Sequence, residues 1–164
     1  MLEDWADERG YTVLEPQLES LPHALERLRT INPTIESILR KKGDTLLRFR
    51  IGENATFFWH LLVRATHDAH PAAALISATA RQNAAELFQL SAYPAVLSND
   101  RFTVWANESR AARMMADAPT RGLLPADISY LTVGNLIILD FTPRPFDPIE
   151  FDRMITVMEQ IIRK

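Results

Sequence analysis

The 164-residue chain contains no cysteine, and this absence removes several kinds of site at once. Without thiols there is no disulfide, thiolate zinc site, iron–sulfur cluster or cysteine nucleophile. Glycine is also scarce, with five residues spread over the whole chain. No two glycines are close enough for a phosphate-binding G-x-G-x-x-G or G-x-x-x-x-G-K loop, and the G-x-S-x-G elbow is absent. Nucleotide-binding proteins and hydrolases that depend on these motifs are therefore excluded.

Long apolar runs are missing as well, since no stretch approaches the roughly eighteen residues of a membrane span. The first residues, MLEDWADERGY, are acidic, unlike the start of a signal or transit peptide. A net charge of −3 gives no overall attraction to nucleic acid, so such binding would need a local basic patch. We expect a cytoplasmic protein that makes no contact with a membrane.

With 47% hydrophobic and 24% charged residues, the chain has the balance of one globular domain with a substantial core. Apolar residues spaced by three and four, together with start and stop residues, predict helices over 2–9, 17–30, 33–42, 72–90, 108–116 and 151–162. Extended apolar runs predict strands over 45–51, 55–66, 95–97, 102–105 and 136–141. The first two strands are joined at 52–54 as an antiparallel hairpin. We therefore predict a single α/β domain over residues 1–164, with a mixed central sheet flanked by helices.

Basic residues are concentrated between positions 40 and 50. Lysine and arginine neutralise phosphates, so this segment predicts a phosphate-facing patch. The alternative is that the cations at 40–42 stabilise a helix C-terminus while those at 48 and 50 lie on a solvated strand face. The residues concerned are Arg40, Lys41, Lys42, Arg48 and Arg50.

Histidines suggest a second kind of site. His67 and His70 flank Asp68 in the segment HDAH, and His60 lies seven residues earlier on a predicted strand. Imidazole and carboxylate are ligands of zinc and similar ions, and Asp44 is a further candidate ligand. The alternative is a solvated loop in which the aspartate stabilises a turn. No H-E-x-x-H arrangement supplies a general base, and we expect no cofactor.

Three segments carry a resemblance to a known family. They are LLVRAT at 61–66, the residues Arg81, Gln82 and Asn83, and the hairpin segment YPAVLSNDRFTVWANE at 93–108. In this order they resemble the nuclease core of the PD-(D/E)xK superfamily, in particular the amino-terminal nuclease region of type I restriction motor subunits. The resemblance covers residues 35–108, with a carboxy-terminal strand and helix over 133–164. It implies a restriction-endonuclease-like fold.

The resemblance also implies a metal site that this sequence does not complete. The family's chemistry needs an acidic residue on an earlier strand and then Asp or Glu two residues before Lys, so that carboxylates hold Mg²⁺. The matching positions here are Leu62, Val63 and Arg64, and Asp44 or Glu53 could replace the earlier acid. We therefore predict a non-catalytic relative that binds DNA or serves as an assembly subunit. Its nucleic-acid contacts would be Arg40, Lys41, Lys42, Arg48, Arg50, Arg64, Arg81 and Gln82.

Two other functions remain open. One is a small acidic homodimeric chaperone or adaptor that uses the apolar stripe of the last helix, from Phe151 to Ile162, although that stripe could equally close the chain's own core. The other is a metal-dependent enzyme that uses His60, His67, Asp68 and His70.

Overall fold

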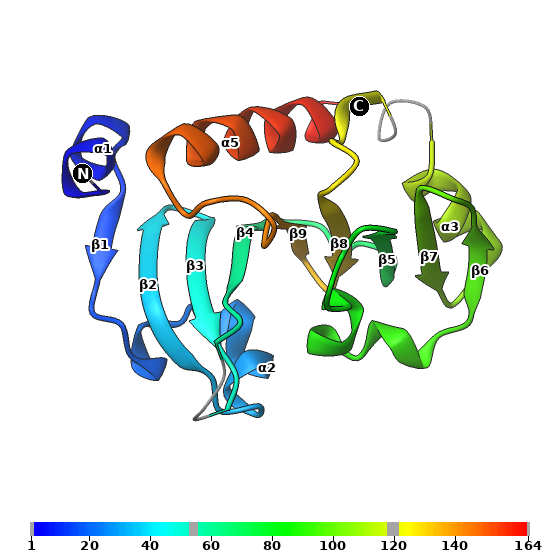
Figure 1. Ribbon diagram of the computed structural model, residues 1–164, viewed down its shortest axis with the longest axis horizontal. Helices are drawn as coiled ribbons and strands as arrows, with labels where there is room; N and C mark the ends of the chain where they lie inside the picture. The colour runs from blue at the N-terminus through cyan, green and yellow to red at the C-terminus, as the bar shows by residue number, and fades with distance from the viewer. Residues whose placement is uncertain (1, 53–55, 118–121, 164) are drawn as a thin grey trace.

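The computed structural model describes residues 2–52, 56–117 and 122–163, and its strands form one nine-stranded sheet (Figure 1). The spatial order of the strands is β1-β2-β3-β4-β9-β8-β5-β7-β6, and every neighbouring pair is antiparallel. The strands are β1 (Thr12–Leu14), β2 (Thr34–Lys41), β3 (Asp44–Arg50), β4 (Trp59–Ala65), β5 (Ala73–Ser77), β6 (Ala95–Ser98), β7 (Phe102–Ala106), β8 (Ser129–Val133) and β9 (Leu136–Asp140).

Helices cover both sides of the sheet (Figure 1). One side, here named the α5 face, packs against α1 (Leu2–Arg9), α3 (Ser109–Met115) and α5 (Pro148–Ile162). The other side, named the α2 face, is covered by α2 (Glu26–Arg29) and four short 3-10 turns. These turns are η1 (Leu18–Ser20), η2 (His23–Leu25), η3 (Ala84–Phe88) and η4 (Leu90–Ala92). No helix among the described residues has the length and apolar character needed to cross a membrane.

Strand β4 lies in the interior of the sheet, between β3 and β9, and is apolar on both sides. Leu61 and Val63 face the α2-face core, and Leu62 faces the α5-face core. Successive side chains of a strand point to opposite faces, so a strand covered on both sides has a nearly continuous apolar sequence. The predicted antiparallel pairing of this strand with β3 is confirmed, with Leu47 opposite Leu61. Positions 53 and 54 of the predicted connection lie outside the described residues.

The apolar stripe of α5 is used by the chain's own core. Asp147 caps the helix, since its Oδ1 accepts from the N–H of Glu150 at 3.0 Å, and Pro148 occupies the first turn. Phe151, Met154 and Met158 are fully buried against the sheet. Most of the stripe is therefore occupied by the chain's own core, and Ile162 at its end stays partly exposed.

Residues 33–42 form strand β2, so the helix predicted there is wrong. The spacing of Ile35 and Ile38 suggested a helix, yet both side chains face the α2-face core from a strand. The pairing of β2 with β3 shifts between Ile35 and Ser37. Such a β-bulge adds one residue and turns a strand spacing of two into a spacing of three, which resembles helical periodicity.

Two further helices predicted from the sequence are wrong in type. Over 17–30 the chain forms η1, η2 and the single turn α2, because Pro22 cannot continue a helix. Over 72–90 it forms β5 followed by η3 and η4, since a fully buried short strand cannot be distinguished by periodicity from a buried helix. Strand β8 was not predicted at all. The helices at 2–9, 108–116 and 151–162 and the strands at 95–97, 102–105 and 136–141 are confirmed, with bounds within a few residues.

These corrections change the fold class. A mixed sheet needs parallel strands, which are joined by crossover connections that are usually helical. Two of the predicted helices that would have made such connections, over 33–42 and 72–90, are in the structure strand β2 and the segment from β5 to η4. The described strands form an antiparallel sheet throughout, so the predicted mixed α/β, restriction-endonuclease-like architecture is wrong.

Candidate functional site: an apolar groove between α3 and α5

A groove of about 870 Å³ lies on the α5 face, between α3 and the C-terminal end of α5. Figure 1 shows these two helices on either side of β8 and β5. The floor comes from three adjacent strands, with Ala73 of β5, Thr132 of β8 and Ile137 of β9. The small side chain of Ala73 leaves depth at the centre of the groove.

The two helical walls present large apolar side chains to solvent. Met114 of α3 is 60% exposed and Ile162 of α5 is 39% exposed, while Met115 and Ile161 are buried below them. Exposed aliphatic residues are ordinary when scattered, but a contiguous apolar surface commonly marks an interaction site. Methionine suits such a surface because its flexible, polarizable side chain adapts to different partners.

The third wall, residues 66–71, is fixed to the β8–β9 turn by the main chain. The N–H of Thr66 donates to the carbonyl of Asn135 at 2.8 Å, and the N–H of His70 donates to the carbonyl of Gly134 at 2.7 Å. The hydroxyl of Thr132 donates to the carbonyl of Pro71 at 2.6 Å. These bonds hold the wall in place, so the groove is formed before any partner arrives.

Charges of both signs surround the groove. Asp68 and Asp117 are exposed at its rim, as are Arg113 and His67. On the floor, burial raises the pKa of the Tyr130 hydroxyl above its usual value, so this side chain stays neutral. The groove can therefore bind an apolar segment flanked by polar groups of either sign.

A polar network lies on the other side of α5, at the end of β3 and β4. The guanidinium of Arg64 donates from Nε to Oδ1 of Asp44 at 2.6 Å, and from Nη2 to Oδ2 of Asp44 and to Oε1 of Glu159, both at 2.8 Å. The hydroxyl of Tyr11 donates to Oδ2 of Asp44 at 3.3 Å. These hydrogen bonds, chiefly with Asp44, raise the pKa of Arg64, which in turn lowers the pKa of Glu159. Asp44 and Arg64 therefore join strands to α5.

His60 lies at the opposite end of β4 and is almost fully buried. Its Nδ1–H donates to the carbonyl of Arg144 at 2.8 Å, and its Nε2 accepts from Nη1 of Arg48 at 3.2 Å. Burial, aided by the charge of Arg48, lowers the pKa of His60, which agrees with a neutral ring in this tautomer. Because both ring nitrogens have partners, neither is available to a metal ion.

The predicted metal ligands are not brought together. His67 and His70 lie beside the groove, while His60 is at the far end of β4 and Asp44 is paired with Arg64. Within the described residues, no group of three or more histidine, aspartate or glutamate side chains could hold a metal ion.

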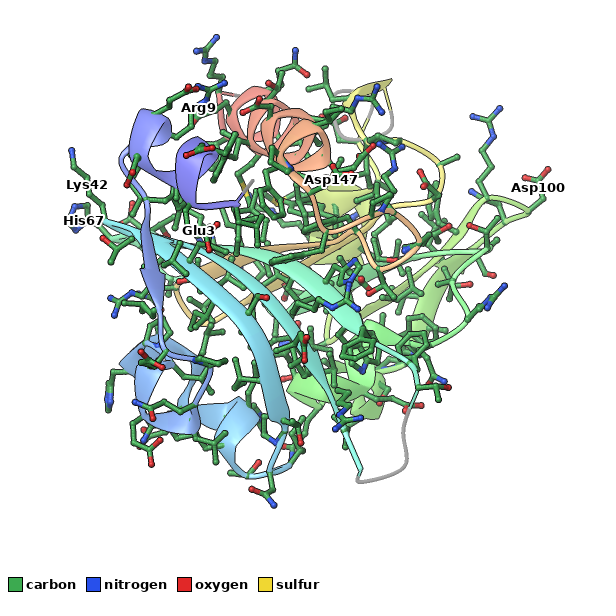
Figure 2. All side chains as sticks on the ribbon, turned by 60° about the vertical axis from the view of Figure 1, so that its left-hand side comes forward. Glu3, Arg9, Lys42, His67, Asp100 and Asp147 are labelled. Carbon is green, nitrogen blue, oxygen red and sulfur yellow. The ribbon has the colours of Figure 1, made fainter. Side chains whose placement is uncertain are left out.

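The predicted nucleic-acid contacts are divided between two ends of the molecule. Lys41, Lys42 and Arg64 lie around the polar network, whereas Arg48, Arg81 and Gln82 line a separate cavity beside His60. Figure 2 shows Lys42 and His67 projecting from the same end of the molecule, with Asp100 at the far side. Arg40 is exposed on β2, and Arg50 is half-buried at the end of β3. The eight residues do not form one patch.

The fold and the groove define an antiparallel-sheet protein with a preformed apolar groove. No model of a known protein family matches the sequence, and no curated protein matches it. Among solved structures, the chain is similar to the crystal structure of the mycobacterial trehalose monomycolate transport factor A, TtfA. The TM-score is 0.59 at 14% sequence identity, and the match covers 96% of this chain and 88% of that chain.

This likeness overturns the earlier functional interpretation. The chain shares with TtfA a sheet whose described strands are all antiparallel, and not the mixed sheet of a nuclease core, so the resemblance to PD-(D/E)xK nucleases is wrong. The non-catalytic DNA-binding function inferred from that resemblance is wrong with it. The motif strand LLVRAT is β4, in which Leu62 packs in the core and Arg64 binds two carboxylates of the same chain.

Sequence reasoning found part of the groove and missed the rest. It singled out His67, His70 and the helix that contains Ile162, but as separate features. It missed Met114, and it missed Ala73 and Thr132 of the floor because β5 and β8 were not predicted as strands. The methionine pair at 114–115 in a predicted short helix was the available signal.

Proposed function

We propose that this chain is a binding protein that takes an amphipathic helix of a partner protein in the groove between α3 and α5. The observation that carries the proposal is the pair of exposed apolar side chains, Met114 and Ile162, on opposite walls of a preformed groove. An amphipathic helix presents apolar anchors at positions i, i+3 or i+4, and i+7, and commonly binds in grooves of this kind.

The rim charges favour a protein helix over a lipid surface. An anionic membrane or headgroup attracts clusters of basic residues of one sign. Here the rim carries both Arg113 and His67 and the two acids Asp68 and Asp117. A helix that carries lysines and glutamates beside its apolar stripe would find opposite charges at both sides.

The similar fold supports a binding role rather than a catalytic one. TtfA is described as a transport factor for trehalose monomycolate. We infer by analogy of fold that this chain also assists a transport process, through contact with another protein. Of the threonine hydroxyls beside the groove, that of Thr132 donates to the carbonyl of Pro71, and that of Thr66 lies within hydrogen-bond distance of two main-chain carbonyls and of Nε2 of His70.

Site-specific crosslinking tests the proposal. A photoreactive benzophenone residue placed at Met114 should crosslink, in the native cells, to a protein segment with apolar residues at helical spacing. The matched control is the same group at Ile149, which is 64% exposed at the other end of α5 and outside the groove. Adducts to lipid, or equal adducts from both positions, would contradict the proposal.

Purified components give the quantitative test. Met114→Glu should weaken binding of the crosslinked segment, synthesised as a peptide, at least about tenfold, because a charge replaces a buried apolar anchor. Ile149→Glu should leave the dissociation constant within about twofold, since rim-distant surface changes contribute little. Unchanged affinity in the Met114 variant, with its thermal melting intact, would show that the groove is not the binding surface.

A further inference from the structure

A second cavity lies at the end of the sheet opposite the polar network, where the ends of central strands meet. Five segments surround it: the end of β3, the start of β4 with the residues before it, the turn after β5, the start of β8 with the residues before it, and the end of β9 with the residues after it. Its volume is about 440 Å³. This volume lies within the range of small-molecule sites, and loops converging at the end of a rigid sheet commonly build such sites.

Asp140, the last residue of β9, is the buried acid of this cavity. It is 4% exposed and lines the cavity wall. Its Oδ1 accepts from the N–H of Thr142 at 2.9 Å and from the Thr142 hydroxyl, whose oxygen in turn accepts from the N–H of His60 at 3.1 Å. Across the described residues, no side chain or main-chain group donates to its second oxygen, Oδ2.

Oδ2 is not among the described side-chain atoms that are fully buried without a hydrogen-bond partner, so it keeps access to the cavity. The carboxylate as a whole nevertheless loses most of its hydration, which disfavours its charged form. Burial accordingly raises the pKa of Asp140 to about 6, although the bonds from Thr142 oppose the shift. Oδ2 is thus an acceptor, aimed at the cavity, that a ligand hydroxyl or N–H would satisfy.

Arg48 supplies donors on the opposite side. Its guanidinium stacks on the ring of Phe58, 4.0 Å from the ring centroid, and donates one hydrogen bond to His60. The stacking and the bond hold the group in one orientation, so its remaining N–H groups are preorganised toward the cavity. At the mouth, the exposed side chain of Gln82 offers both a donor and an acceptor.

The charges of the lining cancel. Arg48 and Arg81 are balanced by Asp127 and Asp140, and Arg144, which donates from Nε and Nη2 to Asp127 at 2.9 Å, is balanced by Glu150. A phosphate would meet Asp140, and an ammonium group would meet Arg48. Neither a strong anion nor a strong cation is favoured, since each would place like charges together.

From these observations we infer that the cavity binds a neutral polyhydroxylated molecule, of the class of sugars and cyclitols. A hydroxyl group donates one hydrogen bond and accepts others. One polyol therefore offers donors for Asp140 and acceptors for Arg48, both of which line the cavity. The half-buried rings of Phe57 and Phe58 provide an apolar side for the carbon skeleton of such a ring.

Titration of the full chain by NMR and calorimetry tests the inference. The probes are glucose, a glucose disaccharide and myo-inositol, with inorganic phosphate and a primary amine as charged comparisons. We expect saturable binding of at least one polyol with a dissociation constant on the order of 1 mM, which is typical of a few hydrogen bonds to a small ligand. Saturation by phosphate or amine alone, or no saturation by any of the three polyols, would overturn the inference.

Variants locate the site. Asp140→Asn should weaken polyol binding at least about tenfold, because hydrogen bonds to a charged acceptor are the strong ones. Gln82→Ala, at an exposed position that folding does not need, should weaken binding about threefold, as expected for one neutral hydrogen bond. Gln160→Ala, exposed on α5, is the matched control, and Met114→Glu in the groove should also leave polyol affinity unchanged. Polyol binding that Asp140→Asn leaves intact would place the ligand elsewhere and overturn the assignment.

Discussion

At the scale of single residues, burial of Asp140 makes its ionisation costly in the folded state, and the hydrogen bonds from Thr142 only partly offset that cost. The carboxyl group is buried at the end of β9, and its pKa is raised to about 6 from 3.8. In the unfolded chain the group ionises near its ordinary value. The folded state therefore binds more protons than the unfolded state between these two values, and the cost of ionising Asp140 is fully present above about pH 6.

Replacement of Asp140 by asparagine should remove that cost. The rise in the pKa of Asp140 corresponds to roughly 3 kcal/mol at about pH 7.5, and the difference should disappear below about pH 3, where the acid is neutral in both states. Urea unfolding of both proteins at the two pH values measures this. Asp100→Asn, at the exposed tip of the β6–β7 hairpin (Figure 2), is the control. Equal stability of Asp140→Asn and the parent at the higher pH would contradict the prediction.

Arg64 and Asp44 show how far the type of a residue alone predicts its role. Arg64 and Asp44 were singled out for nucleic acid and metal because cations bind phosphate and carboxylates bind metal. In the structure each satisfies the other across β3 and β4, where they stand opposite in register. Their partnership depends on strand pairing, and a list of charged residues cannot show whether a charge is already paired.

At the scale of elements, the turn between β2 and β3 shows how local geometry constrains sequence. Lys42 adopts a left-handed conformation with φ of +51°, which is unfavourable for a side chain with a Cβ. The next residue, Gly43, accepts a hydrogen bond from the N–H of Ala65 at 2.9 Å. A Cβ at position 43 would lie 2.9 Å from the carbonyl oxygen of Ala65. The turn therefore lies tightly against the end of β4.

Adjacent substitutions in this turn should have opposite effects. Lys42→Gly should stabilise the protein by about 0.5–1 kcal/mol, because glycine adopts the left-handed conformation without strain. Gly43→Ala should destabilise it by about 1–3 kcal/mol, because main-chain atoms of β4 must move to admit the methyl group. The free energy of unfolding in urea measures both. The geometry would be disproved by a Gly43→Ala protein as stable as the parent.

Elements with strong local signals were predictable from sequence. The helix α5 has a capping Asp147 and a regular stripe, and the β6–β7 hairpin has Asn99, whose Oδ1 accepts from two main-chain N–H groups. Elements without such signals were not predictable. The β-bulge in β2 disrupts the two-residue periodicity of that strand. The sequence of β5 predicts a helix because alanine is compatible with both a helix and a strand.

At the scale of the whole molecule, the order of strands in the sheet differs from their order in the chain. Strand β9 inserts between β4 and β8, and β5 joins the other edge of β8. These pairings are between segments far apart in sequence, so local patterns do not specify them. The cavity beside Asp140 and the apolar groove both depend on them, which is why sequence reasoning found candidate residues but not the sites.

The pairing of β5 with β8 is the shortest inside the sheet. It joins three residue pairs, Ala73 to Leu75 opposite Tyr130 to Thr132, whereas the other interior pairings join five or more. The unit of β5, β6, β7 and α3 should therefore open at lower free energy than β3, β4 and β9. Native-state hydrogen exchange at increasing denaturant measures this. A single opening free energy for amides of both units would show that the sheet unfolds as one.

The floor of the groove crosses this same short pairing. Ala73 belongs to one side of it, and Thr132 and Ile137 belong to the other. A helix bound between Met114 and Ile162 would bridge the β5–β8 pairing, because it contacts α3 on one part of the sheet and α5 on the other. A partner helix bound in the groove would therefore increase the mechanical stiffness of the whole sheet, including segments that the partner does not contact.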